Sequence, residues 1–315
     1  MLERLPSPRS GTVRRTVSLL TVPEPTWVDG LRIVATGRDL AVGDDGARRV
    51  LGTRDLTVAL DGQSRITELA GALPSAVVEG LAGRSVARGL RAHLAGLDRS
   101  LLDPSSLEAA LLDDLPTVGL VSGYGAMMEH PELFAGRRRR SPMIGVCAGW
   151  APDATADRRT RSGEPLLRSA PRAPAMSALT GAPEDFHAEP APRPRTMRRR
   201  RVLDVTATGA GWEVFEYFRD SYFDPGGQEG SLHEYTVRAR VAADGATIED
   251  IAVTPEALPF PECPLAAPYA RELAGTSVRE VGATIRSRLS GTRGCTHLND
   301  VLRFLRHVPA LTSRE

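Results

Sequence analysis

The sequence contains two similar segments, one on each side of a central stretch rich in Pro, Ala and Arg. Several short motifs recur in the same order: GRDL and FRDS at residues 37–40 and 218–221, DLTVALDGQSRI and EYTVRARVAADGATI at 55–66 and 234–248, GLAGRSV and ELAGTSV at 80–86 and 272–278, SLEAALLDDLPTV and HLNDVLRFLRHVPAL at 106–118 and 297–311. Such repetition indicates that one structural unit occurs twice. We therefore expect a first unit over residues 1–150, a linker over 151–195 and a second unit over 196–315.

Each unit has the pattern of an antiparallel sheet followed by helices. In the second unit, residues 233–242 alternate, Asp-Gly at 244–245 turns the chain, and residues 247–255 alternate again. This pattern is typical of a β-hairpin. Helical periodicity follows, with terminating glycines at Gly275 and Gly291. The predicted fold class is α+β, with two repeated units packed as a pseudo-dimer and helices covering one face of each sheet.

Composition excludes several classes of protein. The sequence has no lysine, so a P-loop phosphate lysine and a lysine Schiff base are absent. It has no apolar run long enough to span a membrane and no apolar leader, and three cysteines make no disulfide framework. We expect a cytoplasmic protein without a membrane partner.

Two arginine clusters, at residues 137–140 and 198–201, flank the linker. We favour a solvated connection, and a patch for nucleic acid or an acidic partner is the alternative. The net charge is +1, and no aromatic residues alternate with these arginines. Nucleic-acid binding is therefore disfavoured.

Four potential metal ligands occur in the second unit and have no counterparts in the first. They are His233, Cys263, Cys295 and His297. At the position that matches His233, the motif alignment puts Arg54. The four ligands lie at strand and helix junctions, which we expect to meet at one end of the sheet. Thiolates and imidazoles suit iron, an iron–sulfur centre or zinc.

Cys295 also has the features of a nucleophile. It stands at the start of a predicted helix, where unpaired N–H groups stabilise a thiolate. In this second interpretation the substrate is an acyl group or a thioester, and His233 is the better base because His297 is too close in sequence for an easy hydrogen bond.

Other polar residues near the predicted site have supporting roles. Glu234 and Asp300 are expected to orient the histidines. An Arg-Asp dipeptide occurs at matching places in both units and ends in Asp39 in the first and Asp220 in the second. Its presence in both units favours a structural Arg-Asp pair over a catalytic role for Asp220. Cys147 is expected to be structural.

The motifs CAGWA, RRRRVLDV, HEYTV, LPFPECP and GCTHLNDVLRFL resemble an uncharacterised bacterial family, domain of unknown function 2889, in its long actinobacterial form. This resemblance covers nearly the whole chain and implies no activity.

A more distant resemblance concerns residues 233–305, which look like iron–sulfur cluster scaffold proteins of the NifU type. In that family a cysteine begins a hairpin strand, a second precedes a helix, and a His-Cys pair opens a later helix. His233 stands at the first position, Cys263 at the second, and Cys295 with His297 approximates the third. The resemblance implies a NifU/SufE-like fold and one metal centre. Because the first cysteine is replaced and the last pair is not adjacent, it implies a stable metal site more than cluster assembly.

Three functions remain open from the sequence. The favoured one is a metal-binding protein, with or without metal-dependent catalysis. The second is a cysteine enzyme, and the third is a binding module that uses the arginine-rich linker. The partner is an unidentified small molecule or protein.

Overall fold

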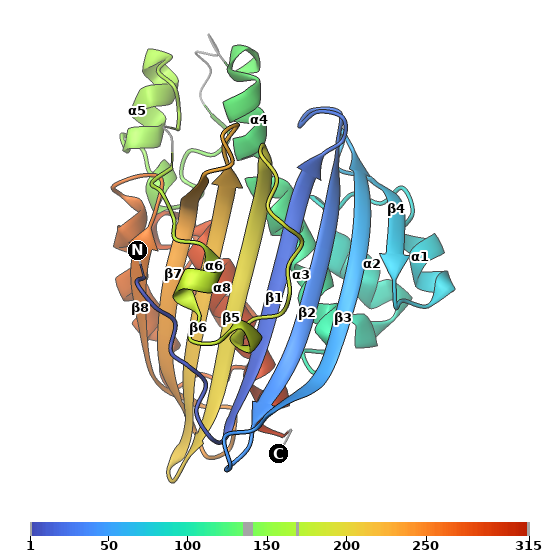
Figure 1. Ribbon diagram of the computed structural model, residues 1–315. Helices are drawn as coiled ribbons and strands as arrows, with labels where there is room; N and C mark the ends of the chain where they lie inside the picture. Colours follow the sequence, from blue (N-terminus) through green and yellow to red (C-terminus); the bar gives the residue numbers. More distant parts are fainter. Residues whose placement is uncertain (1, 135–140, 168–169, 314–315) are drawn as a thin grey trace.

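The computed structural model describes residues 2–134, 141–167 and 170–313, and Figure 1 shows one long twisted sheet with helices packed behind it. The strands are β1 (Thr12–Pro23), β2 (Gly30–Val42), β3 (Arg48–Asp61), β4 (Ile66–Gly71), β5 (Thr196–Thr208), β6 (Gly211–Phe223), β7 (Glu229–Ala242) and β8 (Ile248–Ala257). Their order in this eight-stranded sheet is β4-β3-β2-β1-β5-β6-β7-β8, and every neighbouring pair is antiparallel. The α+β class is confirmed. The strands of the two halves join through β1 and β5 in one continuous sheet, where separate sheets were expected.

Helices cover the rear face of the sheet and bury the larger core. The α-helices are α1 (Ser75–Leu81), α2 (Leu90–Leu97), α3 (Leu107–Val121), α4 (Gly123–Glu129), α5 (Thr155–Ser162), α6 (Met176–Leu179), α7 (Val281–Arg288), α8 (Thr296–Phe304) and α9 (Val308–Thr312), with 3₁₀ segments including η4 (Pro183–Asp185), η5 (Cys263–Leu273) and η7 (Leu305–His307). Strand residues such as Leu203 and Tyr235 are buried in this core together with Leu111 of α3 and Val301 of α8. Among the described residues, no helix is both long and apolar enough to cross a lipid bilayer.

The predicted linker contributes to the opposite face of the sheet. Its boundaries stay a prediction, but residues 151–195 contain α5 and α6, and part of the segment crosses the front of β5 in Figure 1. Met176, Leu179 and Phe186 are buried there in a second apolar cluster with Tyr217. Because α6 has only four residues, these contacts leave no periodic pattern in the sequence.

The arginine cluster at residues 198–201 is buried in the centre of the sheet, so its interpretation as a solvated connection is wrong. Successive side chains point to opposite faces of β5. The even-numbered members pair with Glu189 on one face. The odd-numbered members pair with Asp114 and Asp300 on the other. The other cluster, residues 137–140, lies outside the described residues.

Candidate metal centre

Two side chains of the candidate site come from neighbouring strands. Asp220 on β6 lies directly opposite His233 on β7, and both are buried. The register shifts immediately beyond this pair, because Ser221 is opposite Ser231 and Leu232 is the extra residue of a β-bulge. The bulge brings His233, and not Leu232, opposite Asp220.

The third side chain comes from the first turn of α8. Cys295 is the N-cap residue of this helix, with extended backbone angles (φ −132°, ψ 130°), and His297 is its second helical residue. Leu298, Val301 and Leu302 fix the helix against the sheet because they are buried in the core, as their spacing predicts.

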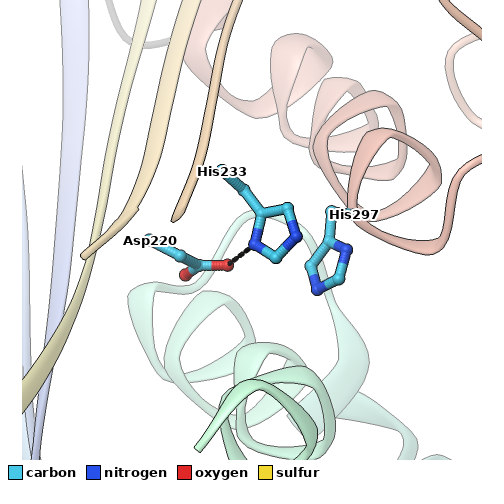
Figure 2. Close-up of side chains that lie close together, drawn as sticks. All are labelled: Asp220, His233 and His297. Carbon is cyan, nitrogen blue, oxygen red and sulfur yellow. Dashed lines mark ion pairs between the residues drawn. The ribbon is translucent and has the colours of Figure 1, made fainter. Parts of the chain in front are cut away.

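Asp220, His233 and His297 converge behind the sheet. Each offers one ligand atom, and these atoms all lie within 4.8 Å of one another. Figure 2 shows the two imidazole rings side by side, with Asp220 beside His233. The rings are stacked, with centroids 3.5 Å apart and planes inclined by 16°. The His233 Nδ1 atom is 3.6 Å from an Asp220 oxygen, which is an ion-pair distance but too long for a good hydrogen bond.

Arg199 holds the Asp220 carboxylate from β5. Its Nε and Nη2 atoms donate to the two carboxylate oxygens at 2.8 and 2.9 Å, which is the bidentate geometry. Burial alone would raise the pKa of Asp220, but the charges of Arg199 and His233 lower it well below its usual range. The carboxylate is therefore ionised, and each oxygen keeps a further lone pair for another partner.

Two buried nitrogen atoms of this cluster have no hydrogen-bond partner among the described residues. They are Nδ1 of His233 and Nε2 of His297. Burial and the neighbouring charge of His233 lower the pKa of His297, which favours a neutral ring. Burying an imidazole nitrogen without a hydrogen-bond partner costs folding free energy. The neutral imidazole is also the form that binds a metal.

A cavity of about 180 Å³ adjoins the histidines. Both rings line it, and so do all three cysteines of the chain, Cys147, Cys263 and Cys295. The rest of the lining is mainly apolar, including Leu120, Met127, Met143, Trp150, Leu167 and Phe260. Cys147, expected to be structural, thus faces the same space as the candidate ligands.

The three thiols differ in acidity. Burial raises the pKa of Cys263 and of Cys147. Burial would do the same to Cys295, but the adjacent His297 ring and the Tyr235 hydroxyl lower its pKa to about 7. The Tyr235 hydroxyl donates to its sulfur at 3.4 Å. His297, and not His233, is therefore the imidazole that acts on this thiol.

The predicted supporting residues have other partners. Glu234 faces the opposite side of the sheet from His233, because adjacent strand residues alternate, and it accepts hydrogen bonds from Tyr217 and Arg219. Asp300 accepts hydrogen bonds from Arg199 at 2.8 Å, so its link to the site runs through the arginine that holds Asp220. Neither carboxylate has a described hydrogen bond to a histidine.

The first half of the chain has the same Arg-Asp pair, with no histidine opposite its aspartate in the sheet, and His307 contacts the arginine of this pair at 2.8 Å. Arg15 on β1 donates to both oxygens of Asp39 at 2.8 and 2.9 Å, and the register of β2 and β3 shifts directly beyond Asp39. Gly52 lies opposite Asp39, so Gly52 is the structural counterpart of His233. The motif alignment had matched His233 with Arg54, which is two residues further along β3. The Arg-Asp pair thus occurs in both halves, and Asp220 additionally lies at ion-pair distance from a histidine.

Residues 197–310 match a family described as protein of unknown function (DUF2889). The expected family is therefore confirmed for this part of the chain, which contains Asp220, His233 and His297. No curated protein matches the chain at a significant level.

Proposed function

We propose that this protein binds one divalent transition-metal ion through Asp220, His233 and His297, beside a cavity that admits a small apolar molecule. The observation that carries the proposal is the convergence of three ligand atoms within 4.8 Å, two of them on rings with buried nitrogens that lack partners. A bound ion would satisfy both nitrogens, and the Asp220 carboxylate would supply negative charge.

The ligand spacing fits an ion after small side-chain movements. Ligand atoms about 2.1 Å from one ion are roughly 3 to 3.5 Å apart in tetrahedral or octahedral geometry. The three atoms lie within 4.8 Å, so each must move by about 1 Å or less, which rotation of the stacked rings can provide. Arg199 fixes Asp220 and limits how far that carboxylate turns.

The donor set favours iron(II) or zinc over an alkaline-earth ion. Two imidazoles and one carboxylate are the protein ligands of mononuclear non-haem iron sites and of catalytic zinc sites, both of which leave positions open. Such an ion would polarise a bound oxygen-containing group or activate water. Cys295 lines the adjoining cavity, interacts with the His297 ring, and is a candidate for a further, sulfur ligand.

Cobalt(II) titration of chelator-treated protein tests the proposal and the ligand set together. Wild type is expected to develop visible absorption that saturates at one equivalent. His233→Ala and His297→Ala are expected to lose this absorption, whereas His93→Ala, which removes a histidine outside the site, keeps it. Absence of saturable binding by folded wild type would contradict the proposal. A sulfur-to-cobalt band that disappears in Cys295→Ser would add Cys295 to the ligands.

A second candidate function uses Cys295 as a nucleophile towards an acyl or thioester group. A specific observation favours it: Cys295 caps α8 beside His297 in the wall of an apolar cavity, and the pKa of its thiol is lowered to about 7. Alkylation of metal-free protein by iodoacetamide, followed by peptide mass spectrometry, is the test. Selective modification of Cys295 over Cys263 and Cys147 is expected, and equal or no modification would count against a nucleophilic role.

We also propose that the two halves are copies of one unit packed as a pseudo-dimer about the β1–β5 pair. The strand order is symmetric about this pair, and the Arg15–Asp39 and Arg199–Asp220 pairs occupy matching positions before matching register shifts. The metal would then be an addition to one copy. A crystal structure whose halves fail to superpose about this axis would contradict the proposal.

A further inference from the structure

A second depression on the helical layer is lined by arginines. It has a volume of about 470 Å³, and its lining residues are Arg91, Arg279, Glu280, Gly282, Ala283, Arg286, Arg303 and Arg306. The arginines come from α2, α7 and its preceding turn, α8 and η7. Among these lining residues, all of them in the described part of the chain, Glu280 alone carries a carboxylate.

The carboxylates beneath the depression are shared and do not neutralise it. Asp113 forms ion pairs with both Arg91 and Arg306. Asp300 contacts Arg303 at 3.1 Å, but it also accepts hydrogen bonds from the buried Arg199. The lining therefore keeps an excess of positive charge.

Arg306 has unused donors at this place. Its Nε and Nη2 atoms are buried and have no hydrogen-bond partner among the described residues, and the nearest Asp113 oxygen is 3.5 Å from Nη2. The Asp113 ion pair at 3.5 Å is thus the described partner of these donors, and because Asp113 is shared with Arg91 it leaves the charge of Arg306 incompletely neutralised.

Gly282 keeps the space between two of the arginines clear. A Cβ atom at this position would lie 3.7 Å from Nη1 of Arg286 and 3.9 Å from Cγ of Arg303. A larger side chain would fill the floor of the depression between the two side chains.

We propose that this arginine-lined depression binds a phosphate-bearing small molecule with at least two negative charges. Guanidinium groups match phosphate oxygens in bidentate geometry, and several converge here on a volume suited to a diphosphate or a nucleotide. The site is separate from the metal centre. His297 and Arg303 lie six residues apart on α8, which is about 9 Å along a helix.

Isothermal titration calorimetry with sodium pyrophosphate, and in a second arm with ATP, tests the proposal. The protein carries His233→Ala and His297→Ala, so that neither ligand can bind through a metal and the result is independent of the metal proposal. Binding in dilute buffer is expected to weaken as salt is added. Each of Arg286→Glu and Arg279→Glu should weaken it by about tenfold or more, because a charge-assisted contact is lost and repulsion is added.

Arg49→Glu is the matched control, because it makes the same charge change at an exposed position on β3 outside the depression. It should leave the affinity unchanged, and circular dichroism should show that every variant is folded. Tighter binding of ATP than of pyrophosphate would assign a nucleotide, and the reverse would assign a simple diphosphate; either supports the site. No binding of either ligand, or equal loss in Arg49→Glu and Arg286→Glu, would overturn the proposal.

Discussion

Replacing His297 by leucine should have opposite effects on the metal-free and metal-loaded protein. In the metal-free protein, Nε2 of His297 is buried without a hydrogen-bond partner, its Nδ1 is 3.4 Å from the Thr296 hydroxyl, and the other polar partner of the ring is the weakly hydrogen-bonding Cys295 thiol. Leucine has a similar volume and would face the mainly apolar cavity. Removing a buried unpaired polar group should raise the free energy of unfolding by about 1 to 2 kcal/mol.

In the presence of metal, wild type should become more stable than His297→Leu. An ion that binds only the folded state at a hundred times its dissociation constant adds about 2.7 kcal/mol to stability. Wild type should gain this amount and His297→Leu should gain almost none. Wild type with zinc is therefore expected to be about 0.7 to 1.7 kcal/mol more stable than the variant with zinc, by the same linkage.

Urea unfolding followed by far-ultraviolet circular dichroism, with and without zinc, measures both effects. His93→Leu serves as the matched control, because it removes a histidine that lies outside the site and should not alter the response to zinc. A His297→Leu variant that is less stable than wild type in chelator would refute the reasoning, because it would mean that the ring is a satisfied structural residue.

Three further outcomes are expected. Glu234→Gln should lower the free energy of unfolding by about 2 to 3 kcal/mol in urea titrations, because it removes the buried charge that pairs with Arg219, yet leave zinc affinity unchanged; a large loss of zinc affinity would restore the predicted orienting role. Burial and nearby arginine charges lower the pKa of His187 from 6.5 to about 3, so its contribution to stability is present above pH 6.5 and is lost as the pH falls towards 3. Stability curves against pH should therefore fall less steeply in this window for His187→Gln, and parallel curves would contradict the assignment. Gly149→Ala should destabilise the fold by roughly 1 to 3 kcal/mol in thermal or urea unfolding, because the new Cβ would lie 2.7 Å from the Cys263 sulfur; an unchanged stability would mean that the cavity wall yields freely.

The convergence of His233 and His297 was expected from their predicted places at strand and helix junctions, but His233 is the fifth residue of β7 and not its start. Asp220 was predicted mainly as a structural residue, since its motif recurs in the first half. The position of Asp220 beside His233 depends on the register between β6 and β7. Phe223 pairs with Glu229 across the turn, and regular pairing from there would put Leu232 opposite Asp220. The bulge changes this by one residue, which moves a different side chain to the site, and the sequence carries no clear signal of it.

The arginines at 198–201 illustrate a second limit. A run of four arginines reads as a solvated surface when only its neighbours are considered. Its burial depends on carboxylates that are distant in sequence, including Asp114, Glu189 and Asp300. Alternation along β5 then separates the four charges onto two faces, and this arrangement exists only once the sheet and α3 are assembled.

The metal content of the purified protein tests the central claim most directly. Wild type and the His233→Ala/His297→Ala variant are incubated anaerobically with iron(II) or with zinc, desalted, and measured by inductively coupled plasma mass spectrometry. We predict about one equivalent of metal in wild type and a negligible amount in the folded variant, because two of three protein ligands are lost. Folded wild type that retains no metal, or a variant that retains as much as wild type, would contradict the assignment of Asp220, His233 and His297 as a metal centre.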